Sequence, residues 1–116
     1  MQSLMSYFYR AQAWSGIMDL DNVLQLAGRD GHTRTVKALL QAGANVHALD
    51  DEALRTAAWW GRTDAVKALL EGGANVHAKH DEALRWAEEE KHLDTVKLLR
   101  EWAAHGNESA FLPPKP

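Results

Sequence analysis

Residues 53–78 read ALRTAAWWGRTDAVKALLEGGANVHA, and parts of this stretch recur elsewhere in the chain at an offset of thirty residues. Three blocks recur in the same register: VKALL at 36–40 and 66–70, GANVHA at 43–48 and 73–78, and DEALR at 51–55 and 81–85. A shortened copy, VKLL, follows at 96–99. Blocks that share one register predict an internal repeat with a period of thirty residues.

Each copy has the pattern of two short amphipathic helices. Apolar residues lie at i, i+3 and i+4 on both sides of Gly61, which separates the two segments. They are Leu54, Ala57 and Ala58 before the glycine and Val66, Leu69 and Leu70 after it. We expect Asp51 and Asp81 to cap the first helices, and the pair Gly72–Gly73 to end a second helix in the left-handed region. The predicted unit is helix, tight turn, helix and loop.

The quoted stretch resembles the ankyrin repeat in its alanine pair, its glycine between the helices, its VKALL helix and its GANVHA loop. The resemblance extends roughly from Asp19 to His105 and implies an all-α, ankyrin-like solenoid of about three helix-turn-helix repeats. Two features depart from the family. Its period is about 33 residues, and the missing residues fall between Ala78 and Leu84, where the family has a β-hairpin finger. Its TPLH tetrapeptide reads NVLQ, EALR and EALR here, so its Thr–His hydrogen bonds are absent. Repeats this short are similar to those of bacterial and large-virus ankyrin proteins.

The repeats are predicted to be flanked by two terminal segments. The predicted units are an N-terminal cap helix over 1–18, repeats over 19–48, 49–78 and 79–106, and an irregular Pro-rich tail over 107–116. The cap helix is expected because apolar residues fall near helical spacing at Leu4, Phe8, Ala11, Trp14 and Met18. A terminal repeat must present a polar face to water, and the last repeat carries charged residues where the second has small or apolar ones. These are Glu88 for Ala58, Arg100 for Leu70 and Lys91 for Gly61.

The resemblance also implies a partner-binding surface on the concave side, formed by the first helices and the loops. The family leaves two positions between the alanine pair and the glycine exposed and variable, and a further binding position precedes the GA of the loop. In this chain these positions hold Arg29, Asp30, Trp59, Trp60, Glu89, Glu90 and Trp102. Arg55 and Arg85 stand where the family has histidine, and they either line the groove or pair with neighbouring acids.

The adjacent tryptophans are the strongest candidates for binding. Side chains of neighbouring residues on a helix point about 100° apart, so Trp59 and Trp60 cannot both be fully buried without help from other segments. A tryptophan at the centre of an interface is a typical hot spot. The alternative is that the N-terminal segment or the tail covers both as a small satellite core. Trp86, one residue before the inner alanine, is expected to pack rather than to bind.

Length and composition exclude several classes of protein. The 116 residues suffice for one domain, and 46% hydrophobic with 25% charged residues is typical of a soluble globular chain. The lack of cysteine excludes disulfides, thiolate metal sites and a cysteine nucleophile. A net charge of -3 lacks the basic excess that direct nucleic-acid binding requires. No stretch approaches the roughly 20 apolar residues of a membrane span. We expect a cytoplasmic protein, located in the host cytoplasm if it is phage or viral.

No catalytic or metal-binding residue is predicted. No Gly-rich phosphate loop or paired-acid motif occurs in a suitable context, and every serine lies in a terminal segment. His47 and His77 should lie in neighbouring loops roughly 8–10 Å apart, whereas two ligands of one zinc ion must each lie about 2.0 Å from it. His77 and His80 have a suitable spacing but lack the further ligands that zinc requires. We therefore expect no cofactor and no enzymatic activity.

The predicted function is non-enzymatic binding of a partner protein through the concave helix surface, by a monomer or a weakly self-associating chain. One alternative is a small phage, viral or bacterial inhibitor that blocks a host defence enzyme or nucleic-acid-processing enzyme by occlusion. A second is self-association through exposed tryptophans or an open flank of the repeats. A third is an engineered repeat scaffold, although the irregular ends are more typical of a natural protein.

Overall fold

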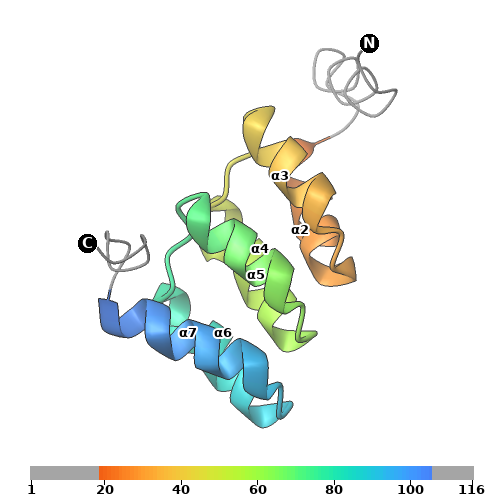
Figure 1. Cartoon of the computed structure of the whole chain (residues 1–116). Coiled ribbons are helices and arrows are strands. Elements are labelled where there is room, and N and C mark those ends of the chain that lie inside the picture. Colours follow the sequence, from red (N-terminus) through yellow and green to blue (C-terminus); the bar gives the residue numbers. More distant parts are fainter. Residues whose placement is uncertain (1–18, 106–116) are drawn as a thin grey trace, which may run out of the picture.

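Three helix-turn-helix units follow one another along residues 19–105, the part of the chain that the computed structural model describes (Figure 1). The helices of these residues are α2 Leu20–Asp30, α3 Thr33–Gln41, α4 Ala48–Trp59, α5 Thr63–Glu71, α6 Ala78–Glu89 and α7 Leu93–His105. The prediction of an all-α, ankyrin-like solenoid is confirmed. The predicted cap helix over 1–18 and the predicted tail over 107–116 lie outside the described residues.

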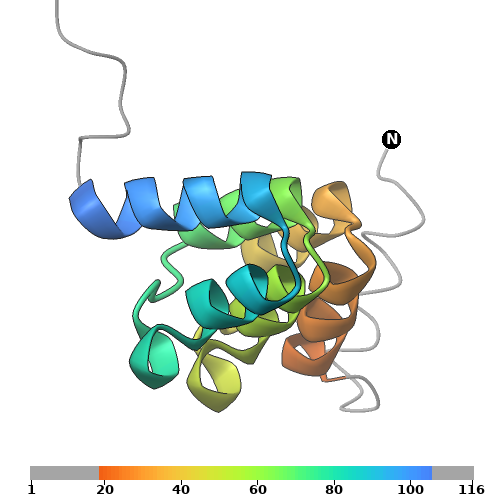
Figure 2. The same cartoon turned by 90° about the horizontal axis from the view of Figure 1, so that it is seen from below.

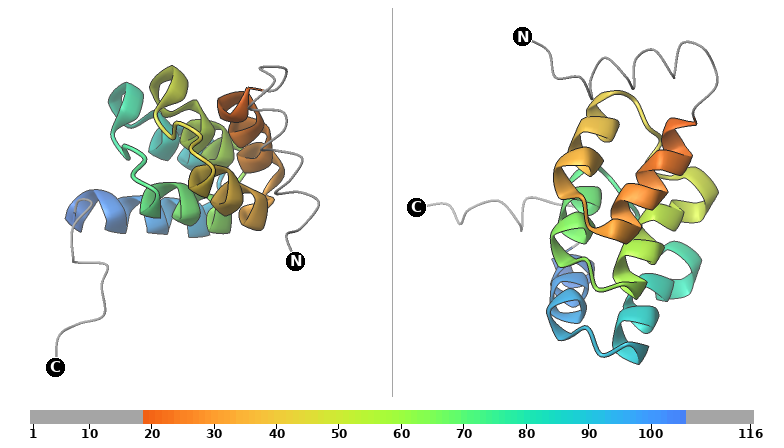
Figure 3. Two further views of the ribbon diagram at one scale, coloured as in Figure 1. Left: turned by 90° about the horizontal axis from the view of Figure 1, so that it is seen from above. Right: turned by 90° about the vertical axis from the view of Figure 1, so that its right-hand side faces the viewer.

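The helices form two layers. The first helices of the units, α2, α4 and α6, pack side by side in one layer, and α3, α5 and α7 form the other (Figures 2 and 3). The core runs between the layers along the whole stack. Its largest fully buried apolar side chains are Leu24, Leu39, Leu54, Leu69, Leu70, Leu99, Val36 and Val66. Leucine recurs at 24, 54 and 84 and at 39, 69 and 99, and valine recurs at 36, 66 and 96, so corresponding positions of the three units build one continuous core.

The turns between paired helices require a left-handed residue. Gly31 (φ 74°) follows α2 and Gly61 (φ 68°) follows α4, and both positions suit glycine because it has no Cβ. Next to each, the amide of His32 donates to Ala27 O and that of Arg62 to Ala57 O, at 2.9 Å. Lys91 takes the same conformation in the third unit, with φ 61°. A side chain in this region costs conformational energy, so the last turn is less favourable than the other two.

Left-handed turns of three residues replace the β-hairpin fingers of the family. Leu49–Asp51 and Lys79–Asp81 all have φ between 55° and 62°, at the starts of α4 and α6. The prediction that Asp51 and Asp81 cap these helices is wrong, because both belong to the left-handed turns. The Asp51 carboxylate instead accepts from the Asn75 amide at 2.7 Å, in the loop of the following unit. A loop shortened by three residues therefore reverses tightly and is tied to the next one.

The last unit ends differently from the other two. Gly43 and Gly73, with φ 102° and 104°, allow the chain to leave α3 and α5. In α7, which corresponds to α5, the matching position holds Ala103 instead of glycine. The helix continues past it to His105. On the flank of α6 and α7, Glu88 pairs with Arg100, and both side chains are exposed. A polar pair thus occupies the positions that apolar residues fill where another unit stacks.

Candidate partner-binding surface

Two tryptophans meet on the exposed side of the α2, α4 and α6 layer, which we call the inner face. The ring centroids of Trp59 in α4 and Trp86 in α6 lie 5.4 Å apart with an interplanar angle of 83°, an edge-to-face arrangement. Both side chains are half-buried. Trp60, the next residue, is 50% exposed. The prediction that Trp59 and Trp60 cannot both be buried is confirmed. Trp86 packs against Trp59, as the sequence favoured, and its side chain remains half-buried.

A ladder of contacts between side chains twenty-seven residues apart crosses the inner face. Gln25 Nε2 donates to Glu52 Oε1 at 2.6 Å, joining α2 to α4. Arg55 NH1 donates to Glu82 Oε1 at 2.5 Å, joining α4 to α6. The Trp59–Trp86 pair has the same spacing. These contacts hold the first helices in a fixed relation, so the surface requires little ordering when it binds.

Arg55 is part of this scaffold rather than of the binding surface. It is only 8% exposed, and its Nε and NH2 donate to the carbonyls of Asp50 at 3.0 Å and Leu49 at 2.8 Å. Its guanidinium also lies 5.8 Å from the centre of the Trp86 ring. The interpretation that Arg55 pairs with a neighbouring acid is therefore confirmed, and the alternative that it lines the groove as a partner-binding residue is wrong. The left-handed turn needs a donor for its carbonyls, and Arg55 supplies it.

Arg85 holds the second left-handed turn in the same manner. Its Nε donates to His80 O and its NH2 to Lys79 O, both at 3.1 Å. Its side chain nevertheless remains 51% exposed, with Glu82 Oε2 4.0 Å away. The difference from Arg55 arises because α6 belongs to the last described unit, so no further first helix packs beside it. Arg85 keeps an exposed face that a partner can contact.

The tryptophan before the expected last loop lies in the core. Trp102 is only 6% exposed and belongs to the hydrophobic core of the described residues. Its prediction as a partner-binding residue is wrong, because α7 does not end where α3 and α5 end and the side chain is buried. Without a glycine the helix continues, and its apolar side turns Trp102 inward. The exposed aromatic surface therefore consists of Trp60 together with the half-buried pair Trp59 and Trp86.

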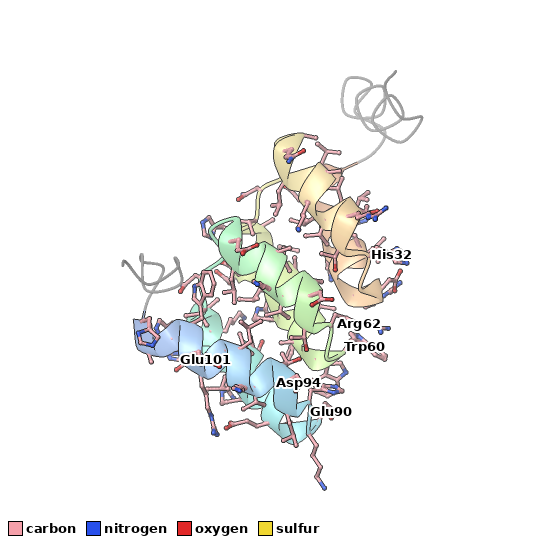
Figure 4. The ribbon with its side chains drawn as sticks, in the orientation of Figure 1. His32, Trp60, Arg62, Glu90, Asp94 and Glu101 are labelled. Atoms are coloured by element: carbon pink, nitrogen blue, oxygen red, sulfur yellow. The ribbon has the colours of Figure 1, made fainter. Side chains whose placement is uncertain are left out.

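The three turns between paired helices lie along one edge of the stack, which we call the turn edge; it comprises residues 29–34, 59–64 and 89–94 (Figure 1). Arg62 Nε donates to Arg29 O at 2.9 Å, and His92 Nε2 donates to Trp59 O at 3.0 Å. The residue before α5 and the residue before α7 thus each bind the end of the first helix of the preceding unit. Figure 4 shows His32, Arg62, Trp60, Asp94 and Glu90 along this edge.

Charge differs from one end of the turn edge to the other. Arg29 Nε lies 3.0 Å from Asp30 Oδ1, and this hydrogen bond lowers the pKa of the Asp30 carboxyl. Both groups are exposed, so the pair contributes little to stability. At the other end, Glu89 and Glu90 are exposed. The predicted flanking charges around the tryptophans are thus a neutral pair on one side and, on the other, two exposed acids that form no ion pair within residues 19–105.

A shallow groove of about 380 Å³ lies between the start of α2 and the left-handed turn of α4. Three of its lining residues are acidic, but each already accepts a hydrogen bond. Asp19 accepts from the Asp21 amide, Asp21 from the Asn45 amide, and Glu52 from Gln25. These carboxylates hold the backbone and the ladder in place. Among residues 19–105 no group of three His, Asp or Glu side chains could hold a metal ion.

The family follows from the repeated architecture together with one comparison. The family model for ankyrin repeats in three copies matches residues 7–80 and again 24–110, which is most of the chain. This chain belongs to the ankyrin repeat family. Ankyrin repeats are generally protein-protein interaction modules, and the family is typically non-enzymatic. No curated protein and no solved structure matches the chain. Within the described helices, none is long and apolar enough to cross a membrane.

Sequence reasoning missed three residues of this surface. Trp86 could have been assigned to it, because a spacing of twenty-seven from Trp59 places it one turn earlier on the neighbouring helix. Leu93 replaces the threonine of the other two turns and is 76% exposed. Arg62 was not singled out, since its bond to Arg29 O joins two units and has no local sequence signal.

Proposed function

We propose that this ankyrin-repeat protein binds a partner protein through the surface on which the inner face meets the turn edge. The observation that carries this proposal is the exposed indole of Trp60 beside the Trp59–Trp86 pair, at the centre of the stack. A large aromatic side chain held in water on a rigid surface loses solvent contact when a partner covers it. Such residues dominate binding energies at protein interfaces.

The flanking side chains set the orientation of the partner. Arg29 and Asp30 lie on the α2 side of Trp60, and Glu89 and Glu90 lie on the α6 side. Arg85 offers a further exposed guanidinium on the inner face. Charged groups at the rim of an interface act mainly on association rate and specificity, whereas the aromatic centre supplies most of the affinity. The proposed mechanism is rigid-surface recognition with little loss of conformational entropy.

A quantitative pull-down tests this proposal. The full chain is immobilised, and proteins retained from a lysate of the source organism, or of its host if the protein is phage or viral, are quantified by mass spectrometry. For Trp60→Ala, the amount of a specifically retained protein is expected to fall by about tenfold, since losing an aromatic anchor costs at least about 1.4 kcal/mol of binding free energy.

The matched control removes an equally exposed apolar side chain elsewhere. Leu49 is 71% exposed in the left-handed turn at the opposite edge of the stack, and Leu49→Ala should retain the same protein as wild type. Circular dichroism must show that both variants are folded. Equal retention by wild type, Trp60→Ala and Leu49→Ala would contradict the proposed surface.

A further inference from the structure

Two large apolar side chains lie exposed where the turns of the second and third units meet. Trp60 is 50% and Leu93 is 76% exposed. His92 brings these turns together: its Nε2 donates to Trp59 O, and its ring lies directly against Gly61. The hydroxyls of Thr63 and Thr95 also share a hydrogen bond of 2.8 Å between the two units. Exposed apolar groups on a fixed edge indicate a binding site rather than a mobile loop.

Three exposed carboxylates lie on the same part of the turn edge, within residues 89–94. Glu89, Glu90 and Asp94 are exposed, and none forms an ion pair with any residue of the described chain. Glu88, one residue earlier, differs because it pairs with Arg100. Lys91 is the only lysine or arginine within residues 88–94. Figure 4 shows Glu90 and Asp94 beside Trp60 on the turn edge.

We propose that this part of the turn edge binds a basic segment of the partner protein, with one apolar side chain against Trp60 and Leu93 and lysine or arginine against Glu89, Glu90 and Asp94. The inference rests on the proposed function, because it names the kind of partner that the same surface takes. Unpaired carboxylates close together repel one another, and a basic segment removes that repulsion. They also attract such a segment before contact and repel an acidic one.

Selection of peptides from a random library displayed on phage tests this chemistry with a defined probe. The full chain should enrich peptides that carry an apolar residue close to two or more lysines or arginines. The double variant Glu89→Lys/Glu90→Lys should bind those peptides at least about tenfold more weakly by fluorescence anisotropy. When the same library is selected against this double variant instead of wild type, it should yield peptides with Asp or Glu at the positions where wild type selects lysine or arginine.

The matched control makes the same change of charge away from the turn edge. Glu71 in α5 and Glu101 in α7 are exposed, and Glu71→Lys/Glu101→Lys should enrich the same basic peptides as wild type. If both double variants weaken binding equally, the effect is one of net charge and the inference is wrong. It is also wrong if Glu89→Lys/Glu90→Lys keeps its basic peptides, or if wild type enriches no peptide.

A third variant separates failure of this inference from failure of the proposed function. Trp60→Ala should abolish binding of the selected peptides. If Trp60→Ala abolishes binding but reversal of Glu89 and Glu90 has no effect, the tryptophan surface binds and the assignment of a basic partner is wrong. If Trp60→Ala keeps the peptides, the surface itself is wrongly placed.

Discussion

Replacing Lys91 by glycine should stabilise the protein. Lys91 is the residue of the third turn that takes the left-handed conformation, with φ 61°, where the other two turns have glycine. A side chain in this conformation costs about 1–2 kcal/mol. Removing this strain is partly offset, by about 0.5–1 kcal/mol, because glycine has more conformational entropy in the unfolded chain and loses it on folding. The net expected increase in the free energy of unfolding is about 0.5–1 kcal/mol, which raises Tm by about 2–6 °C for a domain of this size.

Urea denaturation followed by circular dichroism measures this change, and Lys97→Gly provides the control. Lys97 is exposed in the middle of α7, so the same substitution there removes a helix-forming residue without relieving any left-handed conformation. It should destabilise by about 1 kcal/mol. The two glycine variants, made from the same residue in the same unit, should therefore move in opposite directions. Equal destabilisation by both would refute the assignment of a strained turn at Lys91.

Three further substitutions separate scaffold from surface. Arg55→Ala should destabilise by about 3 kcal/mol, because it leaves Glu82 and two turn carbonyls without their buried donor; Arg85→Ala, at the exposed counterpart, should cost about 1 kcal/mol or less. Equal losses in chemical denaturation would mean that Arg55 is not the buried member of the ladder. Trp102→Ala should lower the free energy of unfolding by about 3–5 kcal/mol, because it truncates a core side chain. At a temperature where this variant is folded, it should bind the peptides selected by the turn edge as tightly as wild type does. A loss of stability below about 1 kcal/mol would contradict its burial.

The repeat predicted the fold well because its signals are local and recur. The spacing of Leu54, Ala57 and Ala58 fixes which side of a helix is apolar, and recurrence every thirty residues fixes how helices stack. The left-handed region was anticipated at Gly73, where glycine marks it. It was missed at Leu49–Asp51, because nothing in the residue types there indicates a positive φ. That turn depends on donors from Arg55, which lies beyond the turn in sequence.

The candidate site was only partly predictable, since exposure depends on what the neighbouring units cover. The helix register alone predicted that Trp59 and Trp60 cannot both be buried, because side chains of adjacent residues point about 100° apart. It did not show that Trp60 is the exposed one. Trp102 could not be placed, because its burial follows from a helix end that the absence of glycine displaces. The sequence selected Glu89 and Glu90 of the third turn as candidates, but it could not show that Glu88 beside them pairs with Arg100 on the next helix.

The shortened loop explains why the exposed aromatic surface lies toward the turn edge. A three-residue left-handed turn cannot project a finger, and it takes the guanidinium of Arg55 to satisfy its carbonyls. On the loop side of the stack, polar side chains are therefore engaged in hydrogen bonds to the backbone. Asp21 and Asp51 also accept from the amides of Asn45 and Asn75 in the loops that follow them. At the opposite edge, glycine takes the left-handed conformation in two of the turns, and the side chains that bind backbone carbonyls there are those of Arg62 and His92. The side chains of Trp60, Leu93, Glu89 and Glu90 are thus left in solvent, where a partner can bind them.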